Sequence, residues 1–179
     1  MRQDAEIFSS MIVYGAVCRC KMATALTGRN GQALEDYKKR LLKLNNQVVA
    51  QAPEDLVINT HVCRGNYHST FFSSGAYDSV ADLLFGEENV NAYYLEYDDK
   101  RSGGFAPLAK VSGDKKVVLG LITTKIPQLE DKGKVIARIH EAEKYIPLDR
   151  LYLSPQCGFA SCEIGNKLTE EEQWAKLKL

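Results

Sequence analysis

Val117-Val118-Leu119-Gly120-Leu121-Ile122 is an unbroken apolar run, and Thr123-Thr124-Lys125 follows it directly. A strand that is apolar at every position predicts burial on both faces, which is typical of a parallel sheet covered by helices. Shorter runs rich in apolar and β-branched residues recur along the chain at Met11 to Val17, Leu56 to Thr60, Ala92 to Leu95 and Leu151 to Leu153. The sequence therefore predicts about five parallel strands.

Segments with a helical period lie between these runs. The stretch 34–49 has an apolar stripe at helical spacing, formed by Leu34, Tyr37, Leu41, Leu44 and Val48. Shorter stretches around Leu84 and Ile136 repeat the pattern, and Thr169 with Glu172 has the spacing of a capping box ahead of a last helix. Strands that alternate with helices predict an α/β fold.

The length and composition fit one globular domain over residues 1–179, with 45% hydrophobic and 26% charged residues. No internal repeat, linker or low-complexity tract divides it. Five strands with their crossovers are too few to close an eight-stranded α/β barrel, which usually needs about 250 residues. The periodicity leaves two architectures open, an open sheet or part of a barrel.

The charge balance argues against polyanionic partners. Lys+Arg and Asp+Glu both number 23 and the formal net charge is 0, so we expect no binding of nucleic acid or anionic membranes. No apolar stretch approaches the roughly 18 residues of a bilayer span, and the first residues lack a secretory apolar region. Five cysteines in such a chain favour reduced thiols or metal ligands over disulfides. We expect a cytoplasmic protein.

Metal-binding side chains follow three of the predicted strands. His61 and Cys63 follow the second strand, Glu96 the third, and Cys157 comes shortly after the fifth. The carboxyl ends of strands in an α/β barrel meet at one face, where functional residues sit. His61 and Cys63 are two positions apart in extended chain and point to the same side, and Glu96 and Cys157 would close a tetrahedron from neighbouring strands. This donor set suits Zn²⁺.

Such a site favours chemistry at sulfur. The ligand charges sum to about minus three against plus two for the metal, which keeps a bound sulfur nucleophilic while zinc lowers the pKa of the thiol. We expect alkylation of a thiol substrate rather than activation of water. The alternative for a single cysteine at a strand end is a small buried hydrophobe, and the meeting of ligands at three strand ends favours the metal.

The motifs around these ligands resemble those of the cobalamin-independent methionine synthases and their smaller single-barrel relatives. The resemblance runs nearly unbroken from about Pro53 to the C-terminus, and its most specific parts are His61-Val62-Cys63-Arg64-Gly65-Asn66, Tyr94-Leu95-Glu96-Tyr97-Asp98, Arg101-Ser102-Gly103, Val118 to Lys125, Leu153 to Ala160 and Leu168 to Leu177. It implies the C-terminal part of a TIM (β/α)8 barrel of the type shared with uroporphyrinogen decarboxylase.

The same resemblance implies a zinc-dependent methyltransferase, which transfers a methyl group from 5-methyltetrahydrofolate to the thiol of homocysteine to give methionine. Carried over residue by residue, the zinc ligands fall on His61, Cys63, Glu96 and Cys157, the set found above. The family barrel is longer than this chain. An alternative is therefore a truncated, inactive zinc-binding half-barrel whose open sheet edges need a second copy or a completing chain.

Polar residues beside the ligands are candidate substrate contacts: Arg64, Asn66, Arg101 and Ser102. An arginine there could hold a substrate carboxylate through two parallel hydrogen bonds. A loop salt bridge with Asp98 or Asp99 is an equally good explanation.

Three further residues near the ligands have a predicted role. Ser154 and Gln156 could donate hydrogen bonds to the ligands, although a strand-ending turn also explains Ser154 before a proline. For Lys125 we favour a solvated ammonium over a contact with an anionic substrate.

Overall fold

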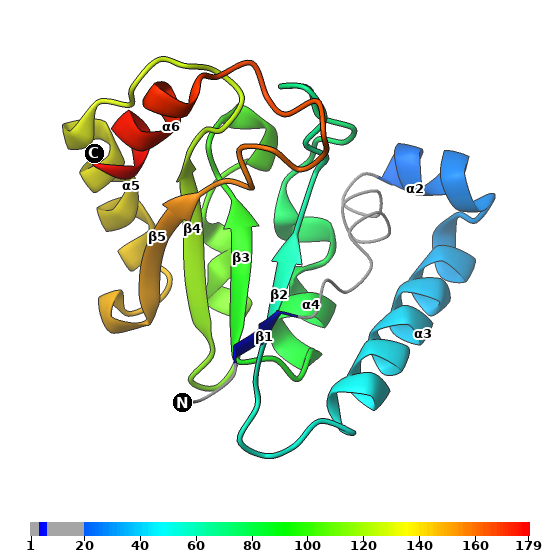
Figure 1. The fold of residues 1–179 in the computed structure, drawn as a ribbon. Helices are drawn as coiled ribbons and strands as arrows, with labels where there is room; N and C mark the ends of the chain where they lie inside the picture. Colours follow the sequence, from blue (N-terminus) through cyan, green and yellow to red (C-terminus); the bar gives the residue numbers. More distant parts are fainter. Residues whose placement is uncertain (1–3, 7–19) are drawn as a thin grey trace.

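The computed structural model describes residues 4–6 and 20–179 (Figure 1). Its strands are β1 (Asp4–Glu6), β2 (Val57–Val62), β3 (Ala92–Glu96), β4 (Lys116–Ile122) and β5 (Leu151–Pro155), and its α-helices are α2 (Cys20–Thr27), α3 (Gly31–Val49), α4 (Ala81–Glu87), α5 (Lys132–Glu143) and α6 (Glu170–Leu177). The last four strands confirm their predictions. The strand predicted at Met11 to Val17 lies outside the described residues.

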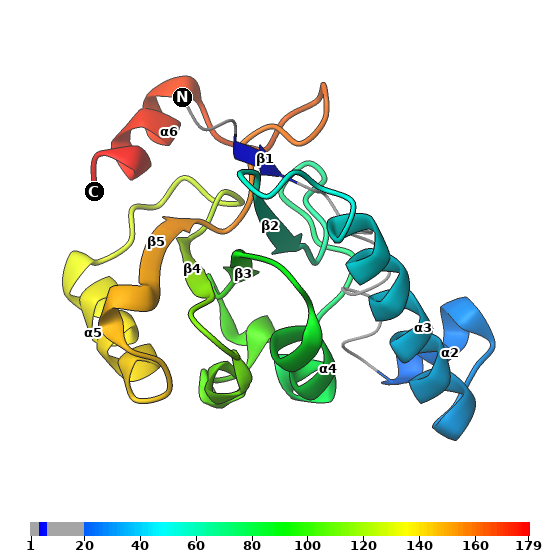
Figure 2. The same ribbon diagram turned by 90° about the horizontal axis from the view of Figure 1, so that it is seen from below.

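The strands form one parallel sheet in the order β1-β2-β3-β4-β5. Each strand pairs with the next one in the chain, which is the order of a barrel wall; a doubly wound open sheet reverses its order at a switch point. Figure 2 shows α3, α4 and α5 along one side of this sheet. The topology therefore favours part of a barrel over an open doubly wound sheet.

The two faces of the sheet have different roles. Tyr93 and Leu95 are fully buried in the core that packs against the helices. Because side chains alternate along a strand, Tyr94 and Glu96 lie on the opposite face, and His61 pairs in register with Tyr94. The predicted ligands thus share the face that carries the barrel interior in folds of this kind.

Helix α3 confirms the helix predicted at 34–49 but buries a different stripe. Its buried residues are Leu34, Lys38 and Leu42, whereas Leu44 and Val48 are exposed. The Lys38 ammonium donates to the carbonyl oxygen of Ser79 at 3.2 Å, next to α4. Contact with α4 therefore selects a face of α3 that apolar periodicity alone does not reveal.

The last helix, α6, begins where its capping box predicts. The Thr169 hydroxyl accepts from the Glu172 N–H at 3.2 Å, and the Glu172 carboxylate accepts from the Thr169 N–H at 2.8 Å. Lys176 then donates to the carbonyl oxygen of Gln128 at 2.6 Å and pairs with Glu130 at 3.0 Å, which docks α6 on the loop after β4.

Among the described residues, no helix has the length and apolarity that crossing a membrane requires.

Candidate metal centre

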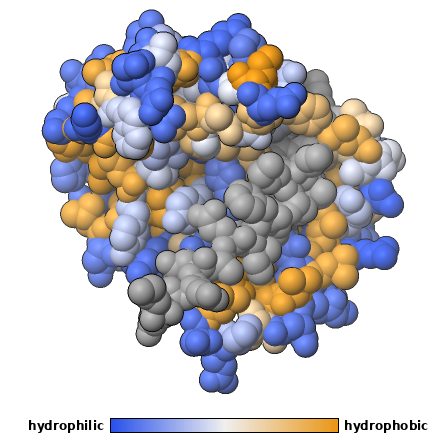
Figure 3. Space-filling model, viewed as in Figure 1, coloured by the Kyte–Doolittle hydropathy of each residue, from blue (hydrophilic) through white to orange (hydrophobic). Residues whose placement is uncertain are grey.

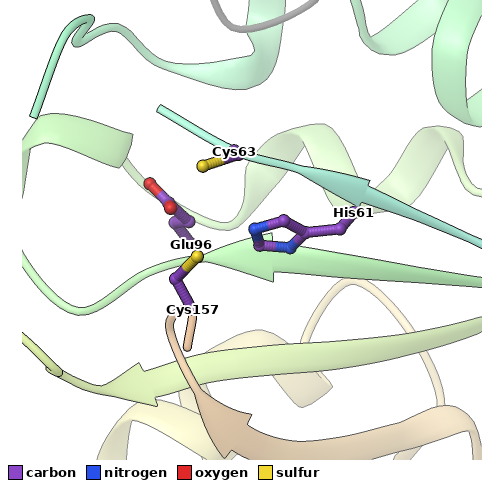
Figure 4. Close-up of side chains that lie close together, drawn as sticks. All are labelled: His61, Cys63, Glu96 and Cys157. Carbon is purple, nitrogen blue, oxygen red and sulfur yellow. The ribbon is translucent and has the colours of Figure 1, made fainter. Parts of the chain in front are cut away.

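Four side chains from three strand ends converge on one point (Figure 4). His61 lies in β2, Cys63 directly follows it, Glu96 ends β3, and Cys157 comes just after β5. Their ligand atoms all lie within 4.8 Å of one another. Tetrahedral zinc holds nitrogen, oxygen and sulfur ligands about 3.3–3.8 Å apart, so small movements would close this set around one ion.

The His61 ring presents one nitrogen to the cluster. Its Nδ1 lies 3.2 Å from the Tyr94 carbonyl oxygen, which accepts and so places the ring hydrogen on Nδ1. Nε2 is buried and has no hydrogen-bond partner within the described residues. Leaving such an atom unpaired is costly, and a metal-bound histidine usually donates its other N–H to a carbonyl. The ring therefore fits a metal ligand bound through Nε2.

The Glu96 carboxylate is buried between neutral hydrogen-bond donors. Its Oε2 accepts from the Arg64 N–H at 3.2 Å, and its Oε1 lies 3.2 Å from the Gln156 side-chain nitrogen when the amide is oriented by its donors and acceptors. Burial raises the pKa of Glu96 to about 7. A carboxylate in such a place is stabilised as an anion by a cation close to it.

The pKa values of the two cysteines are shifted in opposite directions. A hydrogen bond with Cys157, together with burial, raises the pKa of Cys63, and the hydrogen bond from Cys63 lowers the pKa of Cys157. The Gly65 N–H also donates to Cys63 Sγ at 3.3 Å. The directions of these shifts favour the thiolate at Cys157 and the thiol at Cys63 before a metal binds, and metal binding would displace the Cys63 proton.

Binding of Zn²⁺ is expected to release more protons per ion at pH 7 than at pH 8.5. Cys63 contributes one proton at both pH values because its pKa is raised. Glu96, with a pKa of about 7, adds to the release near neutrality but has lost its proton by pH 8.5. Titration calorimetry in buffers of different ionisation enthalpy measures this number. Equal release at both pH values would contradict the assignment.

Cys157 reaches the cluster by crossing the end of β4. The prediction of neighbouring strands is confirmed for Glu96, because β3 pairs with β2, and wrong for Cys157, because β4 lies between β3 and β5. Gly120 of β4 pairs in register with Glu96, and a Cβ on it would lie 2.7 Å from Gln156 Cα and 2.8 Å from the Leu95 carbonyl oxygen. The absence of a side chain at Gly120 therefore lets the chain after β5 pass close enough to bring Cys157 to the other ligands.

Comparison with known proteins places this arrangement in a family. Residues 29–176 match the family described as "Cobalamin-independent synthase, Catalytic domain". The chain belongs to the cobalamin-independent methionine synthase family. A putative vitamin-B12 independent methionine synthase from Listeria monocytogenes superposes with a TM-score of 0.64 and 35% identity, over 92% of this chain and 42% of that one.

Two other relatives also match most of this chain with about two fifths of their own length. A B12-independent methionine synthase from Shewanella sp. W3-18-1, solved with selenomethionine, gives a TM-score of 0.62 at 19% identity, over 80% of this chain and 41% of that one. The uncharacterized protein YxjG of Bacillus subtilis is 49% identical over 149 residues, which are 83% of this chain and 39% of that protein. The chain thus spans about two fifths of these relatives, and its fold is part of their TIM-like barrel.

In this methionine synthase family member, Arg64 lies in the interior beside the cluster. Its guanidinium donates to the Tyr77 hydroxyl at 2.6 Å and to the carbonyl oxygens of Gly75 at 2.7 Å and Glu96 at 3.1 Å. It also stacks on the Tyr77 ring at 4.1 Å. These contacts hold the backbone of Glu96 in place. A contact of Arg64 with substrate stays a prediction.

The other candidate substrate residues also contact protein groups. Arg101 pairs with Asp98 at 3.0 Å and Asp99 at 2.6 Å, which confirms the alternative of a loop salt bridge. The buried Ser102 hydroxyl donates to the Glu96 carbonyl oxygen. Asn66 donates to the Gly158 carbonyl oxygen at 2.6 Å. Substrate binding by these three residues stays a prediction.

The prediction of a solvated ammonium at Lys125 was wrong. Lys125 is 7% exposed rather than solvated, because its ammonium donates to the Gly65 carbonyl oxygen at 3.2 Å and to Asn66 Oδ1 at 2.9 Å. These partners lie about sixty positions away in the chain, so no local signal marks them. The predicted donor role of Gln156 toward Glu96 fits its 3.2 Å contact, whereas the Ser154 hydroxyl bonds the Pro155 carbonyl oxygen at 2.8 Å, as in a turn.

Proposed function

We propose that this chain carries the zinc centre of a methyltransferase that transfers a methyl group from 5-methyltetrahydrofolate to the thiol of homocysteine to give methionine. The observation that carries the proposal is the cluster of His61, Cys63, Glu96 and Cys157, with ligand atoms within 4.8 Å of one another at the strand ends of the family's barrel. It is supported by the His61 ring, whose Nε2 is buried and whose pKa is raised, against the lowering effect of burial, by its interaction with Cys157.

The donor set selects the metal and the chemistry. Two thiolates and an imidazole disfavour Mg²⁺ and Ca²⁺, which prefer oxygen ligands. Bound zinc would lower the pKa of the homocysteine thiol and orient its sulfur toward the methyl donor. The three anionic ligands keep that sulfur nucleophilic, because they offset the positive charge that would otherwise hold its electrons.

The burial of the ligands decides the side from which a thiol approaches. Cys63 and Glu96 are buried, whereas His61 and Cys157 are partly exposed. A substrate sulfur therefore enters beside His61 and Cys157, and the buried pair stays shielded from water. Hydrogen bonds from the Arg64 N–H and from Gln156 keep the Glu96 carboxylate turned toward the centre.

A zinc-binding half-barrel that needs a partner chain is the second candidate. The edge strand β5 leaves Tyr152 46% and Leu153 49% exposed, and Figure 3 shows apolar residues at the surface on the side of β5 and α5. The chain also covers only 42% of the Listeria structure. In this candidate the zinc centre is the same, but a second copy or a completing chain supplies the remaining contacts to homocysteine and folate.

Thiol binding tests the function that both candidates share. We expect homocysteine to increase the sulfur-to-metal charge-transfer absorption of the Co²⁺-substituted protein, because a further thiolate joins the centre. Homoserine, which has oxygen in place of sulfur, is the matched control and should leave the spectrum unchanged. An identical response to both compounds, or none to homocysteine, would contradict the proposal.

Methionine formation separates the two candidates. The chain is incubated with zinc, homocysteine and 5-methyltetrahydrofolate, and methionine is measured by mass spectrometry. Methionine made by the chain alone supports the complete enzyme. Thiol binding without methionine supports the half-barrel.

A further inference from the structure

Beside the metal centre lies a buried ammonium whose hydrogens all go to protein acceptors. Lys125 Nζ donates to the Gly65 carbonyl oxygen at 3.2 Å, to Asn66 Oδ1 at 2.9 Å and to the Gln156 side-chain oxygen at 3.1 Å. A lysine ammonium has three donor hydrogens and no acceptor. Each side-chain amide that meets Lys125 must therefore turn its oxygen toward it.

The first amide, Gln156, links Lys125 to Glu96. Its neighbours assign the orientation of this amide: the oxygen is placed toward the donor Lys125 and lies 3.0 Å from Thr124 Oγ1, and the nitrogen then faces the acceptor Glu96 Oε1 at 3.2 Å. An ionised carboxylate only accepts hydrogen bonds, which agrees with this direction. Reversal of the amide would place its oxygen against the carboxylate and its nitrogen against the ammonium. Lys125 thus keeps a hydrogen-bond donor directed at one metal ligand.

The second amide, Asn66, links Lys125 to Cys157. Because Asn66 Oδ1 faces Lys125, its nitrogen donates to Ser161 Oγ at 2.6 Å. Ser161 accepts there, which leaves its own hydrogen for Cys157 Sγ at 3.8 Å. Asn166 also donates to Asn66 Oδ1, at 2.9 Å, so this second amide is held by two donors.

We propose that Lys125 is a positioning residue of the metal centre, which sets the direction of hydrogen bonds through Gln156 to Glu96 and through Asn66 and Ser161 to Cys157. The inference rests on the proposed function and deepens it. Partners of this kind orient metal ligands, and their loss typically costs about 10–100-fold in metal affinity. The buried ammonium also lies near a centre whose three anionic ligands exceed the charge of one Zn²⁺.

The two paths depend on Lys125 to different degrees. Asn166 still orients Asn66 when Lys125 is removed. Without Lys125, the donor that remains for the Gln156 oxygen among the described residues is the Thr124 hydroxyl at 3.0 Å, which accepts from Asn166 at 3.3 Å but, unlike an ammonium, can also turn to accept from the Gln156 nitrogen. The loss of Lys125 should therefore act mainly through Gln156 and Glu96.

Lys125→Met tests the inference, since methionine has a similar length without charge or donor. We expect the Zn²⁺ affinity to fall about tenfold or more. In the Co²⁺ form, the ligand-field bands should shift because Glu96 loses its oriented donor. Circular dichroism and urea unfolding report on the fold. Lys134→Met, at an exposed position of α5, is the matched control and should keep the wild-type affinity.

A double-mutant cycle with Gln156→Met separates positioning from a general loss of structure. Both single variants should lose Zn²⁺ affinity by a similar factor. The double variant should lose little more, because both changes break the same path from Lys125 through Gln156 to Glu96. Wild-type affinity in Lys125→Met, or losses that multiply in the double variant, would overturn the inference and leave the proposed function standing. A folded wild-type chain without metal would overturn both.

Gln156→Glu is used if Lys125→Met does not fold. Glutamate still accepts from Lys125 but has no hydrogen to donate to Glu96 when ionised. The inference predicts a loss of about tenfold or more in Zn²⁺ affinity. Unchanged affinity in this variant would overturn it.

Discussion

Gly120→Ala is expected to weaken metal binding by about 10–100-fold, although Gly120 is not itself a ligand. The added Cβ would lie 2.7 Å from Gln156 Cα and 2.8 Å from the Leu95 carbonyl oxygen. Both are backbone atoms, so no flexible side chain can move away. Relief must come from a shift of the chain after β5, which carries Cys157, and overpacking should lower the free energy of unfolding by about 1–3 kcal/mol.

Gly86→Ala in α4 is the matched control for this substitution. A Cβ at Gly86 meets no atom within 4 Å, and alanine is favoured over glycine in a helix by about 0.5–1 kcal/mol. This variant should bind metal like the wild type and be no less stable. Zinc content after gel filtration and urea midpoints measure both effects. Full zinc content in Gly120→Ala would refute the positional role of Gly120.

The clustering of the four predicted ligands could be predicted from sequence, because the place of each one depends on its own strand. His61, Cys63, Glu96 and Cys157 each stand at the carboxyl end of a predicted strand, and a parallel sheet brings such ends together. The sequence does not show how the chain brings Cys157 to the other three residues. The crossing of Cys157 over Gly120 depends on a backbone contact between β4 and the chain after β5, which no spacing encodes.

The residues around the ligands show the same limit. Arg64 and Lys125 are charged, and charged side chains are mostly exposed, so burial of both was not foreseen. Their partners come from other loops, such as the Gly75 carbonyl oxygen for Arg64 and Asn66 for Lys125. The observed strand order likewise favours part of a barrel over an open sheet, and strand order cannot be predicted from hydrophobic periodicity.

Cys157→Ser is expected to remove zinc almost completely. A neutral serine hydroxyl is a poor zinc ligand, and the change removes one of two thiolates from a four-ligand centre. It also removes the Cys157 thiol, whose interaction with Cys63 raises the pKa of Cys63. Cys162→Ser is the matched control, because Cys162 is a free, partly exposed cysteine that is absent from the ligand cluster.

The central claim is tested most directly by the zinc content of the purified wild-type, Cys157→Ser and Cys162→Ser chains. Each is passed through gel filtration without added chelator, and zinc per chain is measured by mass spectrometry. We predict about one zinc in the wild type and in Cys162→Ser, and close to none in Cys157→Ser. Folded wild-type protein without zinc, or zinc retained in Cys157→Ser, would contradict the assignment of this site.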